Sequence, residues 1–142
     1  SDVVGRTPIW TAGLAVFTAE SLPDDLQIDR LVLVHCALSP TYNLTTALQG
    51  VRGDIINVHS AGDWWTLGIG TSLLGTMDRQ FTIAAGKDGF DVEQAIPDAS
   101  ARPRLRQIAW DVKARAAGHD GMHLGMLGYE WNRRFVAPLL ME

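Results

Sequence analysis

The chain contains a single cysteine among its 142 residues. One thiol excludes an internal disulfide and any zinc site built on several cysteines. Cys36 lies inside an apolar run, which favours a buried, inert thiol over a nucleophile. The sequence also lacks a signal-peptide pattern and an apolar stretch long enough to span a bilayer. We therefore expect a cytoplasmic protein that makes no contact with membranes.

Positive charge is also scarce, and the formal net charge is −4. This balance gives no electrostatic basis for binding nucleic acid or an anionic membrane. Arg102, Arg104 and Arg106 form a local basic run, but their alternation favours one exposed strand face over a phosphate site. With 46% hydrophobic and 20% charged residues, and neither repeats nor low-complexity linkers, residues 1–142 are most simply one globular domain.

Two nearly apolar, β-branched runs, "IDRLVLVHCAL" (28–38) and "DIINVHS" (54–60), predict strands that are covered on both faces. "RQFTIAAG" (79–86) has weaker strand character, and "RLRQIAWDV" (104–112) alternates like a partly exposed strand. Helical patterns separate these runs, so the sequence predicts an α/β fold. We expect a mostly parallel sheet of about four strands with flanking helices.

The helical segments have recognisable limits. Residues 9–22 are rich in helix formers, and residues 39–51 read as a short loop, an Asn43 cap and a helix ending near Gly50. Residues 64–75 indicate a short helix or a packed loop. The first helix and the closing helix (125–141) should each turn their large apolar residues to one face: Trp10, Leu14, Phe17 and Leu22 in the first, and Met126, Tyr129, Trp131, Phe135 and Leu139 in the last.

In parallel α/β sheets, functional groups gather beyond the carboxyl ends of the strands. Asp63 follows the second strand across a glycine turn and could orient a histidine through a charge-assisted hydrogen bond. The alternative is a turn aspartate that accepts bonds from nearby backbone N–H groups. Trp64 and Trp65 are typical core or interface aromatics, although they could also line a ligand crevice with Ser39.

His119 and His123 lie four residues apart in "GHDGMH", ahead of the closing helix. Their spacing suits metal ligands, but no third candidate ligand accompanies them, since His35 and His59 are strand residues elsewhere. We therefore predict no metal site and no cofactor. A single histidine that works with Asp63 is the sharper hypothesis.

Five segments carry a family resemblance: "DVVG", "GRTPIWTAGLAVFTAESL", "IDRLVLVHCALSP", "INVHSAGDWW" and "RQIAWDVKARAAGHDGMHLG". In this order they resemble the end of the central strand, the elbow and its helix, the next strand, the strand carrying the acid, and the last strand with the histidine loop of an α/β-hydrolase. The resemblance covers roughly residues 3 to 140 and is to the C-terminal half of that superfamily of serine esterases and lipases. The order nucleophile, acid, histidine is the one the superfamily uses.

The resemblance implies Asp63 as the acid and His123 as the base, with His119 as the alternate base. The nucleophile position falls on Thr7, where the pattern fails. Ile9 replaces the second glycine of the sharp elbow, and its β-branch does not tolerate such crowding. Pro8 has no backbone N–H to give to the oxyanion hole, and the loss of one such donor costs about 10²–10³ in rate.

We therefore predict a truncated, hydrolase-like domain without a working serine nucleophile, in which residues 1–9 are of degenerate or foreign origin. The alternatives are an esterase that uses Asp63 and His123 with a nucleophile from Thr7, Ser1, Ser39 or a partner chain, and a module that binds a small ligand. A sheet that begins at a normally interior strand has an unpaired edge and an uncovered apolar face. This implies a homodimer or a larger homo-oligomer.

Overall fold

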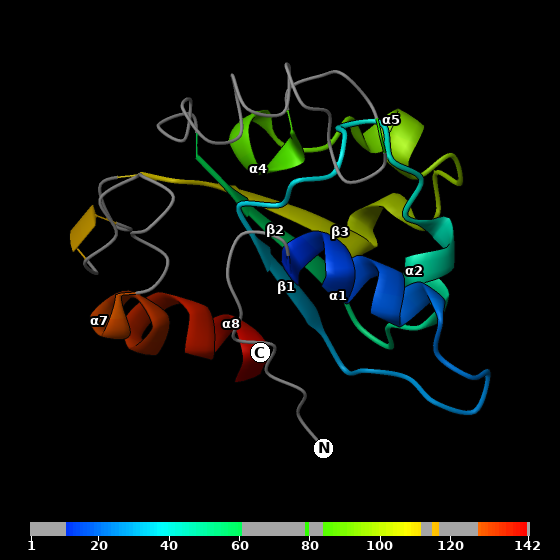
Figure 1. The fold of residues 1–142 in the computed structure, drawn as a ribbon, viewed down its shortest axis with the longest axis horizontal. Helices are drawn as coiled ribbons and strands as arrows, with labels where there is room; N and C mark the ends of the chain where they lie inside the picture. Colours follow the sequence, from blue (N-terminus) through cyan, green and yellow to red (C-terminus); the bar gives the residue numbers. More distant parts are fainter. Residues whose placement is uncertain (1–10, 61–78, 80–83, 112–114, 117–127, 142) are drawn as a thin grey trace.

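The fold is described from a computed structural model for residues 11–60, 79, 84–111, 115, 116 and 128–141. Three parallel strands form one sheet in the order β1-β2-β3, so neighbours in the sheet are also neighbours along the chain (Figure 1). The strands are β1 (Leu31–Val34), β2 (Ile55–His59) and β3 (Leu105–Ala109). Each lies within a range predicted from its apolar pattern, and the α/β class is confirmed.

The helices connect and flank these strands. Parallel pairing requires the chain to return to the starting end of the sheet between strands, and short helices lie along each return. The helical elements described, including those before β1 and after β3, are α1 (Thr11–Glu20), α2 (Thr45–Gln49), α4 (Ala85–Asp88), α5 (Val92–Ala95), the 3₁₀ turn η2 (Arg102–Arg104), α7 (Tyr129–Trp131), the π-helical segment η4 (Asn132–Val136) and α8 (Ala137–Met141).

The strand expected over residues 79–86 is not found in the part that is described. Ala85 and Gly86 belong to α4, and residues 80–83 lie outside the described residues. The backbone N–H groups of Ala85 and Gly86 donate to the carbonyls of Leu38 and Cys36, beyond the end of β1. Their small side chains allow this turn to pack there fully buried. The described sheet therefore has three strands, not about four.

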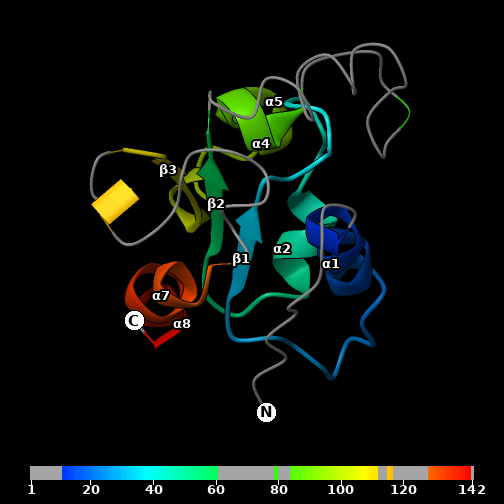
Figure 2. The ribbon, with the colours of Figure 1, turned by 60° about the vertical axis from the view of Figure 1, so that its left-hand side comes forward.

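Alternate strand residues face two separate apolar clusters. The first face packs Leu33 and Ile55 against Val16 of α1 and Leu48 of α2. The second face packs Ile56 and Val58, with Val32, Val34 and Ile108, against Trp131 and Leu139 of the closing helix. Figure 2 shows α1 and α2 on one side of the sheet and α7 with α8 on the other. The expectation of strands covered on both faces is confirmed for β1 and β2.

The inward face of α1 is not the predicted one. Leu14 is 49% exposed and Phe17 is only partly buried, whereas the small residues Val16 and Ala19 are buried. Close packing against α2 explains this choice, because a Cβ added at Gly50 would lie 2.1 Å from the backbone oxygen of Ala19. Gly50 has an ordinary φ of −80°, so this close approach, not backbone freedom, requires glycine.

The predicted end of α2 agrees with the structure, since the helix ends at Gln49 and Gly50 is its C-cap. The predicted Asn43 cap is wrong by one residue, because the N-cap is Leu44, which makes no side-chain capping bond. Asn43 lies just before it, and its side-chain oxygen accepts a hydrogen bond of 2.9 Å from the N–H of Thr45. This bond forms a local turn ahead of the helix.

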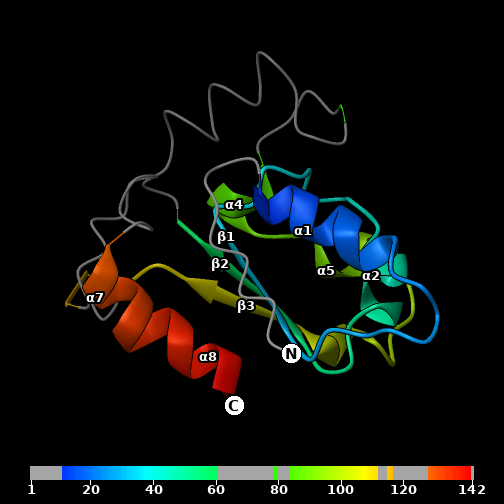
Figure 3. The same ribbon diagram turned by 60° about the horizontal axis from the view of Figure 1, so that its bottom comes forward.

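The closing helix crosses the second face of the sheet from α7 to α8 (Figure 3). Trp131 and Phe135 stack with ring centroids 4.3 Å apart, and Leu139 is also buried. Tyr129 is 70% exposed, contrary to the predicted apolar face. Met126 lies outside the described residues. The π-helical segment η4 changes the 3.6-residue period on which that prediction rested.

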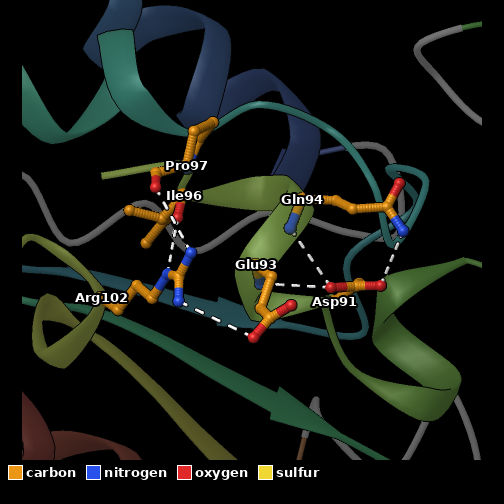
Figure 4. A network of polar contacts seen from close by, with 6 residues as sticks. All are labelled: Asp91, Glu93, Gln94, Ile96, Pro97 and Arg102. Atoms are coloured by element: carbon orange, nitrogen blue, oxygen red, sulfur yellow. Dashed lines mark hydrogen bonds and ion pairs between the residues drawn. The ribbon is translucent and has the colours of Figure 1, made fainter. Parts of the chain in front are cut away.

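Arg106 lies in β3 with a partly exposed side chain, but Arg102 and Arg104 belong to the 3₁₀ turn η2 and not to the predicted strand face. Arg104 donates to the carbonyl oxygens of Leu48, Val51 and Gly53, and so binds the end of α2 to the start of β3. Arg102 donates from Nε to the carbonyl of Ile96 at 3.0 Å, beside the cap that Asp91 forms on α5 (Figure 4). Both guanidinium groups therefore donate hydrogen bonds to backbone carbonyl oxygens, and these two positions do not form a free basic surface.

Candidate functional site

The carboxyl ends of the three strands lie at one edge of the sheet, where residues 84–90, the crossing segment, pass over them. Ala85 and Gly86 donate to the turn after β1, and Ser60, directly after β2, donates its N–H to the carbonyl of Gly86 at 2.9 Å. Figure 2 shows α4, which is part of this segment, above the ends of β1 and β2. The edge where a parallel sheet normally places its functional groups is therefore well defined here.

Three polar strand residues hold the crossing segment, and we call their side chains the clasp: Asn57, His59 and Gln107. All three point to the first face, because residues two apart on a strand share a face and Asn57 is paired with Gln107 in the register. The Gln107 amide accepts from the N–H of Phe90 at 2.6 Å and donates to its carbonyl at 2.9 Å. Asn57 donates to the carbonyl of Ala85 at 3.1 Å.

The clasp satisfies backbone groups that helices and strands would otherwise pair. Phe90 is buried, so its N–H and C=O would be costly to leave without partners. Asn57 is completely buried, and its Oδ1 has no hydrogen-bond partner within the described part of the chain. A polar side chain contributes little to apolar packing in the middle of a buried strand. Asn57 instead holds the crossing segment through its hydrogen bond to Ala85.

His59 is the last residue of β2 and the most exposed member of the clasp on that strand. Its Nδ1 lies 3.3 Å from the carbonyl oxygen of Lys87. Gly89 follows with a φ of +90°, a conformation that other residues rarely adopt. The Lys87 side chain is only 12% exposed, and its ammonium donates to both carboxylate oxygens of Asp88. The edge thus combines an imidazole, a neutral ion pair and a glycine turn.

The turn after β1 is buried. His35 has a left-handed φ of 53°, which is uncommon for a residue other than glycine, and both His35 and Cys36 are enclosed. The predicted burial of Cys36 is confirmed. Ser39, predicted to contact a ligand, is 1% exposed, and its carbonyl accepts from the N–H of Tyr42. Its contact with a ligand stays a prediction.

The other residues predicted for the site are not placed. Asp63, Trp64, Trp65, Thr7, His119 and His123 lie outside the described residues. The strands that precede three of them are placed: β2 ends four residues before Asp63, and β3 ends before both histidines. Because β2 and β3 are parallel neighbours, the chain leaves both strands at the same edge of the sheet.

The clasp was missed by the sequence analysis, which assigned His59 only to a strand. A signal was present, since "IINVH" places an asparagine and a histidine two apart in an otherwise apolar strand. Two polar residues on one face of a strand that should be buried indicate polar partners within the fold. Gln107 could not be paired with them without the register of β3.

Elsewhere the described surface offers little that resembles a site. Hollows of about 170 and 290 Å³ lie beside the end of α2, one lined by Arg104 and Ile96 and the other by Glu20 and Asp24. Within the described ranges, no group of three acidic, histidine or cysteine side chains could hold a metal ion. None of the helices described has the length and apolar character needed to span a bilayer.

Comparison with known proteins identifies no relative. The chain matches no protein-family model, no curated protein and no solved structure.

Proposed function

We propose that the protein is an α/β-hydrolase-like domain that does not turn over esters, because it lacks a working nucleophile. The observation that carries this proposal is the consecutive, parallel order of β1, β2 and β3. In that order, the segments bearing Asp63 and His123 both start at one edge of the sheet. An acid can orient a histidine only from such proximity.

The absence of a working nucleophile has two supports. Pro8, which follows the nucleophile position Thr7, has no N–H to stabilise an oxyanion. Ser39, the one proposed substitute that lies within the described residues, is buried at 1% exposure. A nucleophile must reach the substrate carbonyl, and an enclosed hydroxyl cannot.

Hydrolysis of p-nitrophenyl acetate tests the proposal directly. We expect the parent protein to release p-nitrophenol no faster than the His123→Ala variant, with His119→Ala as the matched control. Turnover that is lost in His123→Ala but retained in Thr7→Ala would overturn the proposal. It would establish an esterase whose nucleophile lies elsewhere, including on a partner chain.

Ligand binding at the same edge is a second candidate function, and the geometry of His59 favours it. An imidazole beside a glycine turn, partly open to solvent, is a group that can contact a bound molecule. Trp64 and Trp65 would line the crevice. Titration of tryptophan fluorescence with acyl and aromatic compounds measures this function, and an unresponsive spectrum across the panel would contradict it.

We further propose that the protein assembles as a homodimer or a larger homo-oligomer. Among the described residues, β1 is paired with β2 on one side only, and its four residues carry no charge. Edge strands of isolated proteins usually carry charges or prolines that prevent pairing with other chains. Sedimentation equilibrium at micromolar concentration should give at least twice the chain mass of 15.5 kDa, and a stable monomer would refute the assembly.

A further inference from the structure

We draw no further inference here: the strongest candidate, the outer edge of β1, belongs to the assembly already proposed, and nothing among the described residues shows what covers it.

Discussion

The two faces of the sheet are built by different means. The first face combines small residues, such as Ala19 against Gly50, with the polar clasp of Asn57, His59 and Gln107. The second face is filled by apolar strand residues under the stacked rings of Trp131 and Phe135. The directional contacts of the clasp therefore lie on the first face, beside the crossing segment. The opposite face is held by apolar burial, which requires volume but little direction.

This difference predicts two kinds of response to substitution. On the second face, the loss in the free energy of unfolding should increase with the side-chain volume removed, and the whole domain should be destabilised. On the first face, the loss in the free energy of unfolding should depend on which close contact or hydrogen bond is removed. The destabilisation should be confined to the crossing segment or to the pair α1 and α2.

Removal of Trp131, the largest fully buried side chain among the described residues, should have the largest effect. Trp131→Ala should lower the free energy of unfolding by about 4 kcal/mol, because truncation of a buried aromatic leaves a cavity and loses its contacts. Urea denaturation measures this. Trp131→Phe, which retains an aromatic ring, should cost less than half as much. Equal losses in the two variants would show that volume does not govern the second face.

A single added methyl group should be nearly as costly on the first face. In Gly50→Ala the new Cβ would lie 2.1 Å from the backbone oxygen of Ala19, so α1 must move away from α2. We expect a loss of about 3 kcal/mol in urea denaturation, the upper range for overpacking. Thr46→Ala, an exposed change in the same helix, is the control. A loss below about 1 kcal/mol would show that the helices separate easily.

Breaking the clasp should have an intermediate, local effect. Gln107→Ala leaves the N–H and C=O of buried Phe90 without their side-chain partners, at a cost of about 2 kcal/mol. Amide hydrogen exchange should accelerate at Phe90 more than in α1. Gln94→Ala removes the same amide at an exposed site, and it should change neither quantity appreciably. Uniform acceleration in both regions would contradict a local clasp.

The smallest effect should come from the exposed charges of the closing helix. Hydrogen bonding from Arg133, helped by the charges of Arg133 and Arg134, lowers the pKa of Glu130 below its ordinary value of 4.5. The stabilising contribution is therefore present above the unfolded-state pKa and is lost as the pH falls through the folded-state pKa. Thermal melts of the parent and Glu130→Gln should differ slightly at neutral pH and converge in acid. A difference that grows in acid would contradict this sign.

The sequence was most informative where one physical effect dominates. Nearly apolar, β-branched runs favour covered strands, and all three observed strands lie within predicted ranges. The start of α2 was predicted to within one residue from Asn43, whose side chain accepts a local bond from the N–H of Thr45. In each case the determining contact lies within the same segment.

Prediction failed where the deciding partner is distant in sequence. Leu14 belongs to an apolar pattern, but the approach of α1 to Gly50 selects smaller residues for the interface. The sequence alternation around Arg104 is typical of an exposed strand, yet its side chain donates hydrogen bonds to carbonyl oxygens about fifty positions earlier in the chain. The clasp could not be predicted for the same reason, because only the register of β3 shows that Gln107 lies beside Asn57.

The consecutive strand order also has a consequence for synthesis on the ribosome. Each strand is synthesised directly after the strand with which it pairs, so the sheet and its first face can assemble while the chain is still growing. The cover described for the second face comes from residues 129–141, and α8 returns to the start of β1, where Arg30 donates to the carbonyl of Leu139. A nascent chain that does not yet include residues 129–141 lacks this described cover over Ile56 and Val58. Such a chain should bind chaperones through this apolar face more strongly than a chain that includes residues 129–141.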